Sequence, residues 1–394
     1  MLPAAGSKPV PQPSRQCLPG LRWLTGRIGE VRRQTGARGG EDRPQTPKGT
    51  SAVGHTNDYL TSVRSAIAAD DTVLAEARTR LALVRNIAMN FPGALRTYAS
   101  GSLRQHTVNH PVTDGDGGLV LNRVNYAKLG PEGGGETPTD VAADLCGLLG
   151  PEIRKTYPMA RCGSSKRGPK ITFGKPINGQ DPSVDLVVAL TRREGNGLWI
   201  PNLQMDRWEA SDPEQHVALL ASGNESLCRT RRRVIRLAKA WNKQWSNPAF
   251  SSFHLSALTL QHVTAGMSIA TALHAVFDGG ARFLATGCNT PDPAEVSEPL
   301  KLMKGVNRDV AVRRLRLAAD AMADALEHDD DKSAVHAALH RVFRHYIDAP
   351  PEDKLASVVA ALRSHRPVTT VTVGLPGPAV AVPPTRAYGG SQPR

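Results

Sequence analysis

A charged residue inside an apolar run constrains this chain more than any other feature of its sequence. The run is Val184-Asp-Leu-Val-Val-Ala-Leu190, and its length and β-branched content predict a strand buried in a sheet. An ionised carboxylate in such a strand is costly unless it is paired, solvated at the strand end or bound to a metal ion. Asp185 is therefore expected to have one of these three surroundings.

Two further acids enter a shorter apolar run earlier in the chain. The segment reads Asp114-Gly-Asp-Gly-Gly-Leu-Val-Leu121, and residues i and i+2 of an extended backbone point to the same face. Asp114 and Asp116 thus present two carboxylates together, and Asp185 adds a third if the two strands pair. Three converging carboxylates suit two Mg²⁺ ions, which prefer oxygen ligands. Such ions can lower the pKa of an attacking hydroxyl and stabilise a leaving pyrophosphate.

This segment also has simpler interpretations than a catalytic one. An Asp-Gly-Asp-Gly run alone is more often a turn, and a calcium loop does not fit, because Gly118 and Asn125 stand at its fifth and twelfth positions. The ordered set favours a site, since Gly101-Ser102 precedes the acids by a gap of eleven residues. Glycine lets the backbone approach a phosphate closely, and the free N–H groups with the Ser102 hydroxyl can hold phosphate oxygens.

Length, composition and cysteine spacing bound the class of protein. The 394 residues suffice for two ordinary domains, and 40% apolar with 22% charged residues fits a soluble globular protein. No stretch approaches the roughly 20 consecutive apolar residues of a membrane span, and no secretory signal is expected. The five cysteines are scattered and never spaced as C-x-x-C. We therefore expect no disulfide framework, no zinc site and a cytoplasmic location.

The net charge of +13 is concentrated at the two ends of the chain. The first 50 residues carry a net +6 and residues 365–394 carry +3, which leaves +4 for the rest. This distribution favours a modest basic cleft for phosphates over an extended nucleic-acid-binding surface. Because both ends are rich in Pro and Gly, residues 1–55 and 365–394 are expected to be disordered, although 368–373 could add an edge strand.

Between these ends the apolar pattern changes near residue 212. Steps of three and four residues predict two helices before Pro92, strands are expected at 97–99, 119–121, 171–173 and 184–190, and a helix at about 139–149. Beyond Asp212 the expected helices are at about 225–245, 252–277, 308–327 and 332–347. An α/β half followed by a helical half is the predicted architecture.

The motifs together carry a family resemblance. Residues 100–121 with Asp185 resemble the polymerase-β-like nucleotidyltransferases, and their spacing is most similar to the CD-NTases, bacterial relatives of cyclic GMP–AMP synthase and oligoadenylate synthetase. The resemblance spans roughly residues 58–348. It departs from the family at Gly117, where an apolar residue is usual, and at Ser256, where many members carry an acid. The downstream segments that also match are Trp208 with Ser211–His216, Arg233–Asn242 and Phe250–Leu255.

The resemblance implies a fold, a division into domains and a metal cofactor. The fold is a polymerase-β-like α+β core, a mixed sheet with flanking helices, followed by a C-terminal helical domain. Residues 56–210 would form the catalytic domain and residues 211–350 the oligoadenylate-synthetase-like helical domain. Asp114 and Asp116 would bind both Mg²⁺ ions, which Mn²⁺ may replace. Asp185 would bind the catalytic ion and assist deprotonation of the acceptor hydroxyl.

The same resemblance implies a donor-nucleotide site. Ser102, next to Gly101, would hold the triphosphate with Lys239 and Ser252, and Phe253 would stack on the base. Without the resemblance, Lys239 would be a solvated helix lysine and Phe253 could equally be a core residue.

Other polar residues near these motifs favour structural roles. His106 and His110 could contact phosphate but are interpreted as exposed loop residues, and His254 is interpreted as structural. Residues 164–170 are interpreted as a solvated hairpin loop, with an acceptor or activator contact in the cleft as the alternative. The basic cluster at 229–233 either adds positive potential near the triphosphate or forms a solvated face.

The function implied by the resemblance is condensation of NTPs into a short, cyclic oligonucleotide second messenger, with release of pyrophosphate, in anti-phage signalling. A regulatory protein, or an effector reached through the product, would be a partner, and no membrane is implied. Transfer to an RNA 3′ end or a small molecule is an alternative, weakened by the low charge of the body. A third alternative, an inactive nucleotide-binding sensor or scaffold, is disfavoured by the complete set of three acids.

Overall fold

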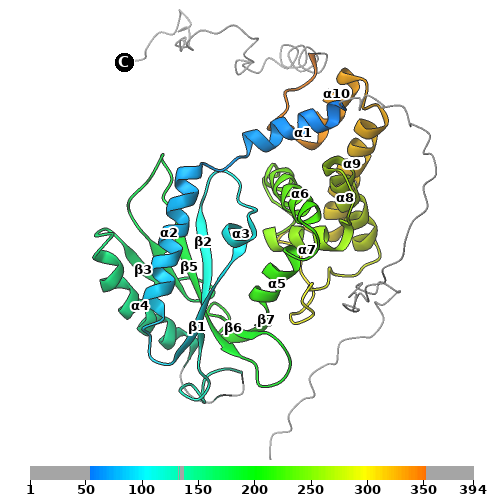
Figure 1. The fold of residues 1–394 in the computed structure, drawn as a ribbon. Helices are drawn as coiled ribbons and strands as arrows, with labels where there is room; N and C mark the ends of the chain where they lie inside the picture. Colours follow the sequence, from blue (N-terminus) through cyan, green and yellow to red (C-terminus); the bar gives the residue numbers. More distant parts are fainter. Residues whose placement is uncertain (1–53, 132, 134–136, 352–394) are drawn as a thin grey trace, which may run out of the picture. The chain divides into compact units, whose positions relative to one another are not determined.

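The computed structural model describes residues 54–131, 133 and 137–351 (Figure 1). The chain divides into two compact units, Met1–Asp348 and Ala349–Arg394, and every element below belongs to the first. Nearly all of the two ends expected to be disordered, and the possible strand at 368–373, lie outside the described residues.

A seven-stranded mixed sheet organises the N-terminal half. Its path runs β1-β2-β5-β4-β3, with β6 pairing both β5 and β7. β2 and β5 are parallel, whereas the other pairs are antiparallel. A parallel pair needs a long connection, and here it contains a helix and the β3–β4 hairpin. The strands are β1 (Ala94–Ser100), β2 (Asp114–Leu121), β3 (Arg161–Ser164), β4 (Pro169–Thr172), β5 (Ser183–Thr191), β6 (Leu198–Asn202) and β7 (Arg207–Ser211).

Two helices cover one face of this sheet. They are α2 (Asp71–Ala88) and α4 (Pro138–Arg154), whose apolar residues pack in one core with those of β2, β4 and β5 (Figure 1). α2 begins where the Asp70 carboxylate accepts a hydrogen bond from the Val73 N–H. α4 begins with a capping box between Thr137 and Asp140. Since α2 and α4 occupy this face, the opposite face remains for a site.

The helical half has its own core, which includes a helix from the start of the described chain. Leu60, Val63 and Ile67 pack with apolar residues of α6 and of the helices that follow it. α1 therefore belongs by packing with the C-terminal helices, beside which it lies in Figure 1. The helices are α1 (His55–Ala66), α5 (Pro213–Leu220), α6 (Glu225–Lys243), α7 (Ser252–His262), α8 (Ile269–Ala285), α9 (Arg308–Glu327) and α10 (Lys332–Val342).

Several predicted elements differ from the observed ones. The helix expected over 252–277 is two helices, because the chain leaves α7 at Val263 and Gly266 adopts a positive φ of +86°. Gly101-Ser102 begins a short helix, α3 (Gly101–Gln105), which was not predicted. The hairpin β6–β7 was not predicted, since Pro201 and exposed polar residues interrupt its alternation.

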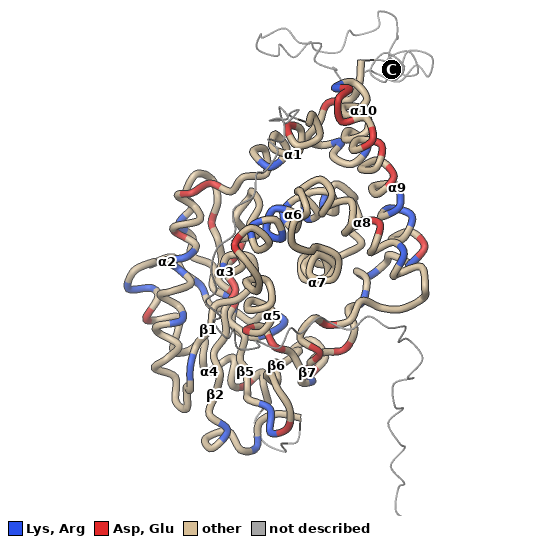
Figure 2. The backbone as a smooth tube through the Cα atoms, turned by 45° about the vertical axis from the view of Figure 1, so that its right-hand side comes forward, with Lys and Arg blue, Asp and Glu red and all other residues tan. Residues whose placement is uncertain are grey.

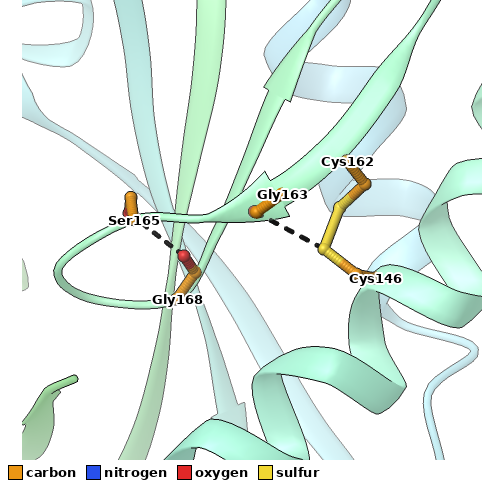
Figure 3. Close-up of a disulfide and its surroundings, with 5 residues drawn as sticks. All are labelled: Cys146, Cys162, Gly163, Ser165 and Gly168. Atoms are coloured by element: carbon orange, nitrogen blue, oxygen red, sulfur yellow. Dashed lines mark hydrogen bonds between the residues drawn. A yellow bond between two sulfur atoms is a disulfide. The ribbon is translucent and has the colours of Figure 1, made fainter.

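The expectation of no disulfide is wrong. Cys146 on α4 and Cys162 on β3 form a disulfide across a separation of 16 residues (Figure 3). The Cys146 Sγ also lies 3.6 Å from the Gly163 carbonyl oxygen, a contact without a donated proton while the sulfur is oxidised. The spacing of the cysteines in the sequence gave no signal, because α4 and β3 are brought together only by packing.

In the described residues, none of the helices combines the length and the apolar character needed to cross a membrane.

Candidate active site

The register between β2 and β5 places the three predicted acids on one face of the sheet. Asp116 is paired directly with Asp185, and Asp114 is paired with Ser183 two residues earlier. Side chains at directly opposed positions project from the same face of a sheet. Gly115 and Gly117 face the helix α2, since a β-carbon at either position would lie within 3.5 Å of Leu81 on that helix. The acids therefore project from the face opposite α2.

Gly101 is required by the position of the Asp116 carboxylate. It has a positive φ of +62°, and a β-carbon built there would lie 1.8 Å from Oδ2 of Asp116. A side chain at residue 101 would therefore suffer both backbone strain and a clash with the acid. The Gly-Ser pair and the acids were singled out separately in the sequence, and here they are in direct contact.

The unusual glycine after Asp116 has a packing reason. A β-carbon at Gly117 would lie 2.9 Å from the backbone oxygen of Tyr98 and 3.1 Å from Cδ1 of Leu81. At Gly118 it would lie 2.1 Å from Cζ of the buried Tyr98 ring. β1, β2 and α2 thus approach too closely for the apolar residue expected at position 117.

The electrostatics of the acids show how closely they are gathered. Burial, together with the neighbouring Asp114 and Asp185 carboxylates, raises the pKa of Asp116 to about 6. Lys239 and Lys170 act in the opposite direction on this pKa. A site that crowds negative charge in this way favours the binding of a cation.

Lys170 is a site residue whose contact with an acid was not predicted from the sequence. It lies opposite Asp185 in the β4–β5 register, and its Nζ is 2.7 Å from Oδ2 of Asp185. Residues 164–170 form the turn of the β3–β4 hairpin and the adjoining strand ends, so the expected hairpin is present, but Lys170 is paired with Asp185 and is not simply solvated. Within that segment Arg167 forms an ion pair of 2.6 Å with Glu209. The segment is thus anchored at both of these residues.

A cavity of about 440 Å³ lies in front of the acids. This volume is typical of small-molecule sites. Asp185 is not part of the cavity wall. It lies beside Asp116, directly opposite it on the neighbouring strand β5. Seven of the predicted site residues line it: Gly101, Ser102, Asp114, Asp116, Lys239, Ser252 and Phe253.

Lys239 is buried in the wall of this cavity. The residue is only 7% exposed, and its Nζ donates a hydrogen bond of 3.0 Å to the Thr107 carbonyl oxygen. Burial and the nearby Lys243 lower its pKa to about 8, while Asp114 and Asp116 counteract that change. An ammonium group has three protons to donate, and Thr107 is its one acceptor in the described residues. The remaining protons are available for an anion.

The N-terminus of α7 forms the facing part of the wall. Ser251 caps the helix by accepting a hydrogen bond from the His254 N–H, so the first N–H groups, at Ser252 and Phe253, lie at the cavity. Helix N-termini attract negative charge. The Phe253 ring lies 4.4 Å from that of His216, which also lines the cavity and contacts Asp292 through Nε2 at 2.6 Å.

Other candidates lie outside the cavity or have structural partners. His106 is exposed at the end of α3, and burial together with Arg232 lowers its pKa. His254 is fully buried, and its Nε2 lies 2.7 Å from the Thr290 hydroxyl. Lys and Arg residues recur along α6 (Figure 2), where Arg229 pairs with Glu225 at 2.6 Å.

The acids fit a hard divalent cation in chemistry but are not assembled around one. In the described part of the chain, no group of three or more His, Cys, Asp or Glu side chains is arranged to hold an ion. The Asp116 carboxylate has no hydrogen-bond partner among these residues, and the Asp185 carboxylate uses a single oxygen, which accepts from Lys170. Carboxylates without a cation repel one another. The donor set therefore suits Mg²⁺, and binding would draw the carboxylates together.

Comparison with known proteins bears on the fold. Neither a family model nor a curated protein matches the sequence. CdnC of E. coli MS115-1, solved as a complex with HORMA-deltaN, matches with a TM-score of 0.53 at 17% identity, over 76% of this chain and 100% of its own. The CD-NTase CdnG of Bradyrhizobium diazoefficiens, solved with GTP, matches with a TM-score of 0.54 at 13% identity, over 78% and 99%. The chain has the CD-NTase fold.

The CD-NTase fold confirms the predicted polymerase-β-like α+β core with a C-terminal helical region. CdnC solved with ATP gives the same result, with a TM-score of 0.54 at 17% identity over 75% of this chain and 99% of its own. At these identities the likeness concerns the fold. The contact of Lys170 with Asp185 and the place of His216 in the cavity wall have no signal in the sequence, because both depend on contacts between distant segments.

Proposed function

We propose that the chain is a Mg²⁺-dependent nucleotidyltransferase that condenses NTPs into a short, cyclic oligonucleotide and releases pyrophosphate. The observation that carries the proposal is the placement of two acids, Asp114 and Asp116, in the wall of a cavity that also holds the buried Lys239. Negative and positive groups facing one cavity suit a ligand that combines metal ions with phosphates.

The phosphates of the donor nucleotide would lie between α3 and α7. Ser102 offers a hydroxyl, Lys239 an ammonium group with unused protons, and Ser252 a hydroxyl at a helix N-terminus. Phe253 is the aromatic ring beside these groups, and it would stack on the base. This arrangement would hold the α-phosphorus close to Asp114 and Asp116.

The reaction would join the acceptor hydroxyl oxygen to the α-phosphorus and break the bond from that phosphorus to the pyrophosphate oxygen. Two Mg²⁺ ions would supply Lewis acidity, lowering the pKa of the hydroxyl and neutralising charge on the leaving group. Asp185 would take up the hydroxyl proton, while Asp114 and Asp116 hold the reacting groups in line. Lys239 and the N-terminus of α7 would stabilise charge on the pyrophosphate.

The setting is proposed on the same basis. CdnC was solved with a HORMA protein and with ATP, and CdnG with GTP. We extend this to a chain that uses NTPs, acts in anti-phage signalling, and is controlled by a regulatory protein or signals to an effector through its product.

The product is the direct test. The purified chain is incubated with the four labelled NTPs and either Mg²⁺ or Mn²⁺, the mixture is treated with phosphatase, and the products are separated. Short products that resist phosphatase are expected, because a cyclic product has no terminal phosphate. Labelled linear products that lose their terminal phosphates to phosphatase, or label that accumulates only on added RNA 3′ ends, would contradict the cyclic product.

A further inference from the structure

Three side chains from three neighbouring strands form a row across the sheet. The strand order β2-β5-β4 places Asp116 opposite Asp185, and Asp185 opposite Lys170. Directly opposed residues share a face and have β-carbons about 5 Å apart. The row therefore reads acid, acid, base, and Asp185 is its middle member.

Lys170 contacts Asp185 from the side away from the other acids. Its Nζ lies 2.7 Å from Oδ2, and Asp185 has no other hydrogen-bond partner among the described residues. One carboxylate oxygen is thus held from the β4 side, and the other has no protein partner. Side-chain exposures of 40% for Lys170 and 24% for Asp185 show that the pair is partly shielded from water.

The lysine is fixed by its own surroundings. β4 pairs with β3, which the Cys146–Cys162 disulfide ties to α4 (Figure 3). Arg167, in the turn between the two strands, is held by Glu209 and by the Pro201 carbonyl oxygen. Because the strand that carries Lys170 is anchored on both sides, the lysine can fix the orientation of the carboxylate it binds.

We propose that Lys170 is a positioning residue. It holds Oδ2 of Asp185 and so presents the other carboxylate oxygen, Oδ1, to a divalent cation at Asp114 and Asp116. The inference rests on the proposed metal-dependent function. Carboxylate ligands of metal ions are commonly held by such a neighbouring group, and removal of the group weakens metal binding by about 10- to 100-fold.

Lys170 could also have the opposite effect on metal binding, and this alternative predicts a change of affinity in the other direction. A cation near the acids repels a metal ion, so Lys170 acting through charge alone would weaken metal binding. Removing the side chain would then strengthen binding. Positioning and charge repulsion therefore predict opposite results for the same substitution.

The experiment measures Mn²⁺ binding by electron paramagnetic resonance without nucleotide, so it needs no turnover. Lys170→Met should bind Mn²⁺ about tenfold more weakly than the wild type, and Lys170→Arg should bind nearly as well, because it restores the donor. Lys166→Met is the matched control, since Lys166 is an exposed lysine of the same hairpin without an ion pair among the described residues. It should leave Mn²⁺ binding unchanged.

A second readout separates positioning from misfolding. The metal concentration for half-maximal synthesis should rise in Lys170→Met, and saturating Mn²⁺ should restore most of the rate, which it could not do for a misfolded protein. Unchanged or tighter Mn²⁺ binding by Lys170→Met, or an Arg variant as weak as the Met variant, overturns the inference. Wild-type protein that binds no Mn²⁺ overturns it together with the metal site, whereas normal Mn²⁺ binding without nucleotide products contradicts only the proposed function.

Discussion

Lys239 on α6 donates a hydrogen bond of 3.0 Å to the carbonyl oxygen of Thr107, which links the helical half to the loop before the acids. Thr107 is buried and lines the same cavity. The contact fixes the ammonium group while leaving its other protons free for a ligand. Lys239, which without the family resemblance would be interpreted as a solvated helix lysine, is therefore part of the cavity wall.

Nucleotide affinity should depend on pH through this lysine. Its pKa in the free protein is about 8, so the amine becomes neutral as the pH rises above that value and loses its attraction for phosphate. Affinity for ATP should fall by up to about tenfold per pH unit above 8. Lys239→Arg, which stays charged, should show no such fall between pH 8 and 9 in equilibrium binding at constant Mg²⁺. The same pH dependence in both proteins would exclude Lys239 as its source.

Substitution of Gly101 should lower the reaction rate by about 100-fold. In Gly101→Ala the new methyl group overlaps Oδ2 of Asp116, so either the acid or the backbone must move. A displacement of about 1 Å at a reacting group can reduce the rate by about 100-fold. The matched control is Gly163→Ala, because a β-carbon at Gly163 meets no atom within 4 Å. Steady-state rates of the two variants should differ widely. Equal rates would show that the close approach of residue 101 to Asp116 does not matter for activity.

Phe253 should affect substrate affinity more than stability. It is partly exposed, lines the cavity and contacts the His216 ring, which are the features of a stacking surface. Phe253→Leu should raise the KM for the donor NTP by about tenfold, because stacking on one base contributes about 1–3 kcal/mol. The kcat and the melting temperature should change little. A lowered melting temperature with an unchanged KM would assign Phe253 to the core instead.

The disulfide should contribute measurably to stability. Closing a loop of about 15 residues stabilises a fold by about 3 kcal/mol in the chain-entropy description, and Cys146 and Cys162 are 16 residues apart. Denaturant unfolding with and without reductant should show a loss of this size. The Cys146→Ala, Cys162→Ala double variant should not respond to reductant. Titration of thiols in denaturant should give two more after reduction, and an unchanged count would exclude the disulfide.

Local patterns in the sequence predicted much of the fold. The strand at 184–190 and the helix at 308–327 follow from apolar periodicity, which reflects local burial. The placement of Asp114, Asp116 and Asp185 on one face followed from the period of a strand and the assumption that the two strands pair. These features depend on nearest neighbours along the chain or on one pairing.

The features that were missed depend on tertiary contacts. Lys170 joins the site through the β4–β5 register, which no local pattern encodes. The Cys146–Cys162 disulfide depends on the packing of α4 against β3. The glycine at 117, noted as a departure from the family, is explained only by the backbone oxygen of Tyr98 on the adjacent strand.

Release of pyrophosphate from NTPs, compared between the wild type and an Asp114→Ala, Asp116→Ala double variant, tests the central claim most directly. Asp144→Ala, at an exposed acid on α4, serves as the control for charge and folding. The wild type and the control should release pyrophosphate in the presence of Mg²⁺. The double variant should be slower by at least about 100-fold, because it lacks the donors that hold the reacting groups. Release by the double variant at the wild-type rate would contradict the assignment of this site.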